Sequence, residues 1–285
     1  MYCYRHPGRE TRVSCSECGR PICTDCMVFA PVGIRCPEHA GKAQGAARVT
    51  KGVRRAAFEG TGALVTKTLI AINVIVFLVN LAQGSSLGQT SGSLFEKGAL
   101  FVSSPFYPGG LADGEWYRLI TAAFLHGNLL HLGFNMFVLW YVGAPVEQAI
   151  GRGRFLALYI VSGLAGSAGA IILDPHAVTV GASGAIFGIL GAALVLEAQR
   201  NYVLGGQAAG LIVVNLVLTF AIPNISIGGH VGGLLGGALS MLALSRFGRT
   251  HAIYGRPGLL GVLGLVAVGV ASVLVAYFRV QGLTA

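Results

Sequence analysis

The chain has 285 residues, of which 54% are hydrophobic and only 11% are charged, and its formal net charge is +9. A soluble globular domain carries about 25% charged residues, so this composition excludes an ordinary soluble protein and favours one that crosses a membrane. A basic balance also suits a protein that binds nucleic acid, but the positions of the basic residues indicate a different cause.

All six cysteines fall within the first 36 residues, where they and two histidines form four pairs of equal spacing. Two residues separate the members of each pair, which lets both side chains bind one tetrahedral Zn²⁺. Eight ligands fill two closed sites and leave no open position, so the zinc is expected to be structural and not needed for catalysis. The candidate ligands are Cys3, His6, Cys15, Cys18, Cys23, Cys26, Cys36 and His39.

Two pairings of these ligands fit the spacing. In an interleaved arrangement, Cys3, His6, Cys23 and Cys26 bind one ion, and the other four ligands bind the second. In a sequential arrangement, neighbouring pairs along the chain share an ion. A disulfide framework is the alternative to metal, and it is disfavoured in a module that faces the reducing cytoplasm. The module at 1–40 resembles a B-box zinc finger, with its last Cys-x2-His pair as a departure. Closed metal sites do no chemistry, so we expect this module to hold a cytoplasmic protein partner.

Seven apolar segments follow a basic linker, rich in Gly and Ala, at residues 41–66. A helix rises 1.5 Å per residue, so about 20 residues cross the hydrocarbon core of a bilayer. The fourth and fifth segments are short for a full span, and we expect them to tilt against their neighbours or to begin below the surface. The predicted segments are 68–82, 119–141, 155–173, 184–198, 208–222, 227–244 and 259–278.

The basic residues indicate how these segments are oriented. With the amino terminus in the cytoplasm, seventeen of the twenty Lys and Arg lie on the inner face and three, Lys97, Arg118 and Arg279, on the outer face. Positive charge gathers on the cytoplasmic side, so we expect a multi-pass protein of the cell membrane with its carboxyl terminus outside. Topology and contact with anionic lipid then explain the net charge, and no nucleic-acid partner is expected. No signal peptide is expected, and the excess of Arg over Lys with abundant Gly and Ala is typical of a GC-rich bacterial genome.

Two polar residues at the ends of apolar segments carry the strongest functional signal. Ser183 lies in Gly-Ala-Ser-Gly before the fourth segment, and His230 lies in Gly-Gly-His-Val-Gly-Gly within the sixth. Serine with histidine is the minimum set for nucleophilic catalysis, and an ionisable residue in a membrane segment indicates function. Both segments begin after an outer loop, so both residues are expected at the same depth. The alternative is that the serine packs a helix interface and the histidine is a structural hydrogen bonder.

Glycine surrounds both of these residues. Gly184 and Gly188 form a small-residue face on the fourth segment, and glycines repeat every four residues from Gly229 on the sixth. Faces of this kind let two helices approach closely, near enough for a serine hydroxyl to reach an imidazole. Gly181 is expected to clear space around that hydroxyl.

A third element, His131-x3-Asn135, lies in the second segment. The i, i+4 spacing places both side chains on one face of a helix. Acyl transfer needs donors aimed at the developing oxyanion, and the Asn135 amide, a His131 ring N–H and the Ser183 backbone N–H are the candidates. A structural bond between helices is the alternative, above all for His131.

The stretch from about residue 68 to residue 244 resembles the rhomboid family of intramembrane serine proteases. The matching motifs are Gly181-Ala182-Ser183-Gly184, Gly229-His230 and His131-x3-Asn135, and Glu115-Trp116-Tyr117-Arg118 is similar to the family's Trp-Arg element. The resemblance implies an all-α polytopic membrane protein with a six-helix core, to which this chain adds a seventh transmembrane helix and the zinc module. It also implies a Ser183–His230 dyad without a third acid.

Two residues depart from the family's pattern. Tyr117 stands where the family often has a tryptophan, and Phe187 stands where some members have a tyrosine that stacks on the histidine. An aromatic ring is kept at both positions, so the packing is expected to survive, whereas a phenolic hydrogen bond at 187 is lost. Asp174 is the acid near Ser183 in sequence, and we expect it to help a turn with Pro175 instead of completing a triad.

The sequence thus predicts an intramembrane serine endopeptidase that cleaves transmembrane protein substrates near the outer face of the bilayer. Its predicted parts are a double zinc module at 1–40, a linker at 41–66, a six-helix domain at 67–246 and a seventh helix at 257–278. The alternative is a rhomboid-like protein that binds or escorts membrane proteins without cutting them. A transporter or channel is disfavoured because acidic residues are nearly absent from the apolar segments.

Overall fold

The computed structural model describes residues 1–29, 34–39, 62–246 and 258–284, which belong to two units. Met1–Arg54 form the first unit and Arg55–Ala285 form the second. The cores of the two units differ in kind. Buried cysteines surround Ile22 in the first, whereas aliphatic and aromatic side chains of helices fill the second.

The first unit has little regular structure. A 3-10 turn, η1 (Thr24–Cys26), precedes a two-stranded antiparallel ribbon of β1 (Val28–Phe29) and β2 (Ile34–Arg35). Five of the six cysteines are buried, and only Cys18 is exposed. A core of this size rarely stabilises a fold by itself, so the unit needs a further source of stability such as bound metal.

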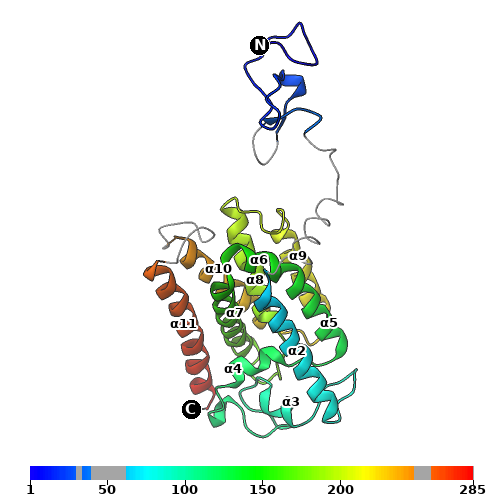
Figure 1. Ribbon diagram of the computed structural model, residues 1–285. Coiled ribbons are helices and arrows are strands. Elements are labelled where there is room, and N and C mark those ends of the chain that lie inside the picture. The colour runs from blue at the N-terminus through cyan, green and yellow to red at the C-terminus, as the bar shows by residue number, and fades with distance from the viewer. Residues whose placement is uncertain (30–33, 40–61, 247–257, 285) are drawn as a thin grey trace. The chain divides into compact units, whose positions relative to one another are not determined.

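The second unit is built of helices, as the sequence predicted (Figure 1). The helices run up and down beside one another, and the short ones lie in the connections. In chain order they are α2 (Leu64–Ala82), α3 (Ser93–Gly98), η2 (Leu111–Asp113), α4 (Arg118–Thr121), η3 (Ala122–Phe124), α5 (Leu129–Val138), the π-helical η4 (Leu139–Gly143), α6 (Ala144–Ile150), α7 (Arg152–Leu173), α8 (Ser183–Ala198), α9 (Ala208–Ala221), α10 (Ile227–Arg246) and α11 (Leu259–Thr284).

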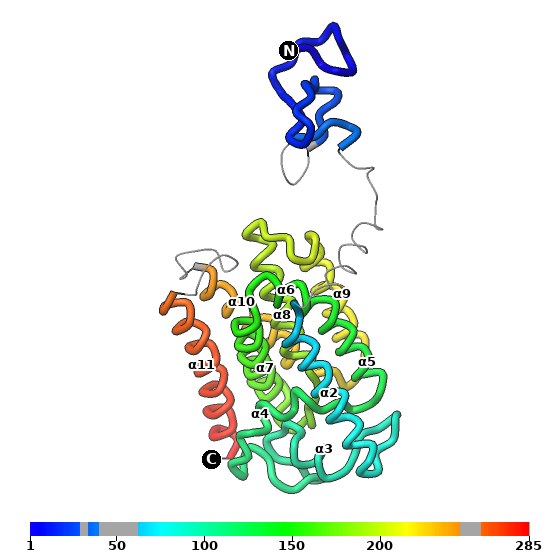
Figure 2. The backbone as a smooth tube through the Cα atoms, viewed as in Figure 1, coloured from blue at the N-terminus to red at the C-terminus, as the bar shows by residue number. Residues whose placement is uncertain are grey.

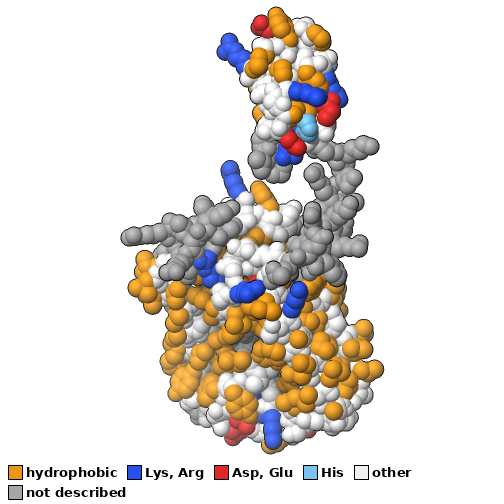
Figure 3. All heavy atoms as spheres, viewed as in Figure 1, with side chains coloured by type: hydrophobic (Ala, Val, Ile, Leu, Met, Phe, Trp, Pro, Cys, Tyr) orange, Lys and Arg blue, Asp and Glu red, His pale blue; other side chains and the backbone are white. Residues whose placement is uncertain are grey.

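Five helices among the described residues are long and apolar enough to cross a membrane. The predicted fourth and fifth segments form the shorter apolar helices α8 and α9, of 16 and 14 residues. Figure 3 shows a wide belt of hydrophobic side chains over the flank of this unit, with most of the unit's visible Lys and Arg side chains beyond one edge of the belt. The chain is therefore an all-α polytopic membrane protein. The five longer helices span Leu64–Ala82, Leu129–Ile150, Arg152–Leu173, Ile227–Ser245 and Leu259–Thr284.

The second span differs from its predicted bounds. It was expected at 119–141, but the long helix covers Leu129–Ile150 and continues through α5, η4 and α6. Its start is fixed by Asn128, which has extended backbone and accepts a hydrogen bond from the His131 N–H. Its end is fixed by Gly151, whose φ of 86° favours glycine.

Three glycine-rich helices, α7, α8 and α10, pack together at the centre of the unit (Figure 2). A Cβ atom on Gly233 would lie 2.0 Å from the carbonyl oxygen of Gly184, and one on Gly237 would lie 2.0 Å from that of Gly188. Real side chains do not tolerate such distances, so α8 and α10 touch backbone to backbone, as the glycine spacing predicted.

The seventh helix, α11, is part of the packed unit. It lies against α7 and α10, and the face that it buries includes Gly269, Ser272 and Ala276. At its far end the ring of Tyr277 contacts Trp116, with 5.7 Å between the ring centroids. This contact ties α11 to the loop that precedes α4.

A buried carboxylate fixes the start of α2. Glu147, in α6, accepts hydrogen bonds of 2.7–2.9 Å from the backbone N–H groups of Val65 and Thr66 and from the Thr66 hydroxyl. The first N–H groups of a helix have no partner within the helix, and the helix dipole favours an anion beside them. Glu147 therefore acts as a cap supplied by another helix.

Candidate functional site

Ser183 is the first residue of α8, and a glycine turn leads the chain to it. Gly181 has a φ of 127°, a conformation that residues with side chains rarely adopt. A Cβ atom on Gly181 would also lie 2.8 Å from Cε1 and Nε2 of His131. Glycine is thus required here both by the backbone and by the space, and Ser183 itself is half-buried.

His230 lies one turn into α10 and is buried. The ring of Phe187 stacks on its imidazole, with 4.2 Å between the centroids and 21° between the ring planes. The predicted aromatic packing at position 187 is therefore confirmed. On one edge of the imidazole, Nδ1 lies 2.6 Å from Oγ1 of Thr219 in α9.

The contact between α8 and α10 adjoins Ser183 and His230. A Cβ atom on Gly184, the residue after Ser183, would lie 3.2 Å from the carbonyl oxygen of Gly229, the residue before His230. Phe187 stands one turn after Ser183 on the same face of α8, and its ring covers His230. Ser183 and His230 therefore belong to the same end of one helix contact.

Asn135 and His131 share one face of α5, as their spacing predicted. Asn135 is buried, and its Nδ2 donates to the carbonyl oxygen of His131 at 2.9 Å. A side-chain amide has two N–H donors, so this bond holds the amide in place and leaves the second N–H for another acceptor. Part of the predicted donor capacity of Asn135 is thus used within its own helix.

The imidazole of His131 lies beside the serine. Its Nε2 is 2.8 Å, and Oγ of Ser183 is 3.6 Å, from the point that a Cβ atom on Gly181 would occupy. The Gly127 N–H donates to Nδ1 of His131 across a long 3.5 Å contact. An accepting Nδ1 places the proton of the neutral ring on Nε2, which is the nitrogen on the side of Gly181.

Sequence reasoning missed Thr219, because a threonine among apolar residues in a helix reads as ordinary packing. Its hydroxyl occupies the Nδ1 edge of His230, which is the position that the acid fills in a catalytic triad. Asp174 is exposed beyond the end of α7, and its carbonyl oxygen accepts from the Ala177 N–H in a turn, as expected. Among the described residues, no carboxylate bonds to the His230 ring.

The Trp-Arg element folds into a brace for the loop before α4. The Arg118 guanidinium is 1% exposed and donates to the carbonyl oxygens of Glu96 and Ala99 at 2.7 Å and to the Glu115 carboxylate. The Gly110 N–H also donates to that carboxylate, and this bond together with Arg118 holds the pKa of Glu115 below its usual value. Arg118 is thus a structural residue in this fold.

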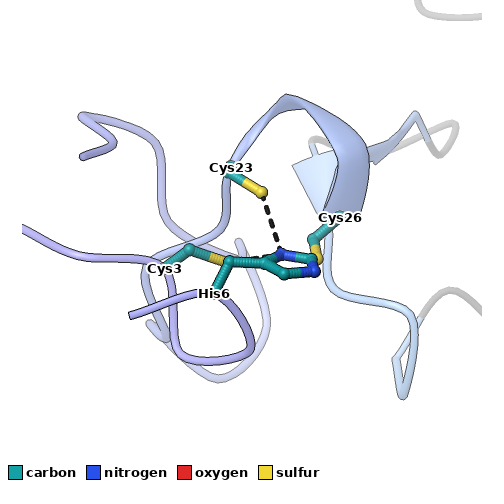
Figure 4. A group of neighbouring side chains, drawn as sticks. All are labelled: Cys3, His6, Cys23 and Cys26. Carbon is teal, nitrogen blue, oxygen red and sulfur yellow. Dashed lines mark hydrogen bonds between the residues drawn. The ribbon is translucent and has the colours of Figure 1, made fainter. Parts of the chain in front are cut away.

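The eight candidate zinc ligands form two clusters. Within each cluster the ligand atoms all lie within 4.8 Å of one another, and Figure 4 shows the side chains of the first cluster converging. The grouping is the interleaved one, not the sequential one. The first cluster is Cys3, His6, Cys23 and Cys26, and the second is Cys15, Cys18, Cys36 and His39.

The distances within the clusters suit a tetrahedral metal ion. The Nδ1 atom of His6 lies 3.3 Å from Sγ of Cys23 and 3.4 Å from Sγ of Cys26. Zinc bonds of about 2.0 Å to nitrogen and 2.3 Å to sulfur at tetrahedral angles separate the two ligand atoms by about 3.5 Å. In the second cluster, Nδ1 of His39 lies 3.1 Å from Sγ of Cys36. None of the six cysteines forms a disulfide.

Comparison with known proteins extends the likeness beyond these motifs. The chain is 36% identical over 194 residues to the rhomboid protease GluP of Bacillus subtilis (strain 168). It is 37% identical over 151 residues to the putative rhomboid protease YdcA of the same organism, and 37% identical over 158 residues to RHOMBOID-like protein 5 of Arabidopsis thaliana. These matches cover 66%, 51% and 51% of this chain, and 36%, 76% and 50% of the relatives.

The region of likeness coincides with the helices that carry the site. Residues 113–247 match the family model of the Rhomboid domain, and this range includes α5, α8 and α10 with their contacts around Ser183 and His230. The chain spans about a third of the length of GluP and three quarters of that of YdcA. A match of this extent to YdcA, with the helical fold and the family's domain over the same residues, places the chain in the rhomboid family.

Proposed function

We propose that this protein is an intramembrane serine endopeptidase in which Ser183 is the nucleophile and His230 the general base. The observation that carries the proposal is the glycine contact between α8 and α10, flanked by these two residues, with the Phe187 ring stacked on the imidazole. The relatives GluP and YdcA, which bear the name rhomboid protease, support the same activity. The substrates we infer are membrane-anchored protein segments.

The reaction proceeds in two halves. Oγ of Ser183 attacks the carbonyl carbon of the scissile peptide bond while His230 takes the hydroxyl proton. The C–N bond then breaks, and the imidazolium returns that proton to the leaving amine. In the second half His230 takes a proton from water, the resulting hydroxide attacks the acyl carbon, and the serine leaves with the proton restored.

Three donors are proposed to stabilise the oxyanion. The backbone N–H of Ser183 stands at the first position of a helix, where it has no partner within the helix. The His131 ring presents its Nε2–H on the side of Gly181, and Asn135 has a second amide N–H to offer. Removing one donor of this kind lowers kcat by about 10²–10³-fold.

We infer that cleavage takes place near the outer face of the membrane. The basic residues favour a cytoplasmic amino terminus and a carboxyl terminus outside, and in that orientation both Ser183 and His230 follow outer loops. Water would then reach Ser183 and His230 from the outer face of the membrane, where these loops lie. We propose that the chain is divided into a zinc module at 1–40, a linker at 41–66, a six-helix domain at 67–246 and a seventh helix at 257–278.

The amino-terminal module is proposed to hold two structural Zn²⁺ ions and to recruit substrates or another cytoplasmic protein. Its core is small, so metal bound by the two clusters would supply much of its folding free energy. If the module recruits substrates, deleting residues 1–45 should reduce cleavage of natural substrates more than cleavage of a small generic one. Equal effects on both would argue against recruitment.

The activity is tested with a serine-directed fluorophosphonate, because this probe requires no knowledge of the substrate. Oγ of an activated serine displaces fluoride from the phosphorus and stays covalently labelled. We expect labelling of the parent protein in detergent micelles and none of Ser183→Ala or His230→Ala. An unlabelled parent that is well folded would favour the alternative of a rhomboid-like protein that binds membrane proteins without cutting them.

A further inference from the structure

We propose that Thr219 is a positioning residue for His230: its hydroxyl oxygen accepts the Nδ1–H of the imidazole and so keeps Nε2 free of a proton. The inference rests on the Ser183–His230 dyad of the proposed function and adds the group that orients the base.

Thr219 lies in the last turn of α9 and is 2% exposed. Its Oγ1 makes two short contacts, one of 2.6 Å to Nδ1 of His230 and one of 2.7 Å to the carbonyl oxygen of Asn215. Separations of this size between polar atoms are hydrogen-bond distances, so each contact needs a hydrogen between its two atoms.

The number of hydrogens decides which group donates. A threonine hydroxyl has one hydrogen. If Thr219 donated it to Nδ1, two oxygens would face each other across 2.7 Å with no hydrogen between them, which is repulsive. If Thr219 donates to Asn215 instead, its oxygen accepts from Nδ1–H and both contacts become hydrogen bonds. The second arrangement is the stable one.

The tautomer that results is the one that a general base requires. A neutral imidazole with its proton on Nδ1 has a lone pair on Nε2, and this lone pair accepts the serine proton. Phe187 covers a face of the ring, and Thr219 holds the Nδ1 edge. A ring turned over in its own plane would keep the stacking but lose the hydrogen bond to Thr219, so Nε2 stays on the side available to Ser183.

Thr219 thus takes over part of the work that a carboxylate does in a triad. The triad acid holds the imidazole in one tautomer and also stabilises the imidazolium by its charge. A neutral hydroxyl supplies the first effect and not the second. Removing the hydroxyl should therefore slow the reaction less than removing a triad acid does.

The test compares three variants in detergent micelles. Thr219→Val keeps the shape and removes the oxygen, Thr219→Ser keeps the oxygen, and Ser272→Ala is the matched control. Ser272 is also a buried hydroxyl in an apolar helix that donates to the carbonyl four residues earlier, that of Val268. We expect Thr219→Val to lose about 10- to 100-fold in the rate of fluorophosphonate labelling, as for partners that orient a metal-bound histidine. Thr219→Ser and the control should react like the parent.

A second readout does not depend on activity. In protein labelled with ¹⁵N-histidine, the His230 signals are assigned by their loss in His230→Ala, and the parent should show a protonated Nδ1 and a bare Nε2. A parent ring with its proton on Nε2, or unchanged labelling of folded Thr219→Val, would overturn the inference. If Thr219→Val does not fold, the parent's tautomer and the Thr219→Ser rate still decide it. A parent with the expected tautomer that is never labelled would contradict the proposed function while supporting the role of Thr219.

Discussion

The backbone of Gly233 in α10 lies against Gly184 in α8 so closely that a Cβ atom on Gly233 would be 2.0 Å from the Gly184 carbonyl oxygen. Two helices can meet in this way only where both lack side chains. Because Gly184 adjoins Ser183, the separation of the helices at this point also sets the distance between the proposed nucleophile and its base.

Gly233→Ala should therefore force the two helices apart. Overpacking of this kind costs about 1–3 kcal/mol of folding free energy. We expect the rate of fluorophosphonate labelling to fall even where the variant is still folded. Gly210→Ala is the control, because that glycine lies in α9 and a Cβ atom on it would have no neighbouring atom within 4 Å. The control should match or exceed the parent in thermal stability. A Gly233→Ala variant that reacts at the parent's rate would show that the spacing of α8 and α10 is not critical.

The stacking of Phe187 on His230 predicts a specific dependence on the aromatic ring. Phe187→Leu fills a similar volume without a ring and should lose the contact, which is worth about 0.5–1.5 kcal/mol. We expect labelling to slow by up to about tenfold, since about 1.36 kcal/mol corresponds to a factor of ten in rate. Phe187→Tyr keeps the ring and should react like the parent. Equal rates for the Leu and Tyr variants would contradict a role for stacking.

Glu147 should be one of the main stabilising residues of the helical unit. In Glu147→Gln an amide replaces the carboxylate that accepts from two N–H groups and one hydroxyl at the start of α2. A hydrogen bond to a charged group contributes about 1.5–3 kcal/mol, so the variant should lose at least that much. Thr66→Val removes a single donor and should lose less. Denaturation in micelles followed by circular dichroism checks the order, and Glu96→Gln serves as a control at a half-exposed carboxylate.

The loop before α4 should open in acid. The folded state lowers the pKa of Glu115, mainly through the Gly110 N–H and then through Arg118, so the unfolded loop binds a proton more readily than the folded one. The stabilisation is therefore complete above the usual pKa of 4.5 and is lost as the pH falls through the lower folded-state value. Trp116 fluorescence in a Trp140→Phe background should shift on acidification. Glu115→Gln should show the shifted emission already at neutral pH, and an unshifted spectrum would contradict this account.

The helices could be predicted well where run length decides them. The predicted fourth and fifth segments differ by about one residue from α8 and α9 because Gly- and polar-rich turns flank each apolar run. The start of the second span could not be predicted from hydropathy. The apolar residues at 119–125 continue the run in sequence, and the helix begins only at the cap formed by Asn128. Such a cap depends on a local hydrogen bond, which the length of an apolar run in the sequence does not reveal.

In the candidate site, too, some residues could be predicted from the sequence and others could not. Ser183 and His230 stand out in the sequence because polar residues are rare in apolar segments and glycines mark the faces beside them. Thr219 could not be found in this way. Its partner lies on the next helix, and the contact forms only because the short turn between α9 and α10 brings the two side chains together. The bond from Asn135 to its own helix was equally invisible, since spacing gives the face of a side chain and not its acceptor.

The two cysteine clusters make the metal content of the module a test of its fold. In the interleaved grouping, Cys3 and Cys23 belong to one cluster, whereas Cys3 and Cys15 belong to different clusters. The double variant Cys3→Ser/Cys23→Ser should therefore keep about one zinc ion per chain, because the second ligand set remains complete. Cys3→Ser/Cys15→Ser damages both sets and should lose both ions.

The sequential grouping reverses this order, which makes the pair of variants decisive. There Cys3 and Cys15 would share one site, so their double variant would keep an ion, and the Cys3/Cys23 variant would lose both. Zinc measured by mass spectrometry on the purified full chain gives the answer without any assay of activity. Loss of both ions from both variants would mean that the two sites fold as one unit. Such a result would follow from the small core, because a core built mainly of cysteines has little apolar surface to keep one metal site folded when the other loses its ion.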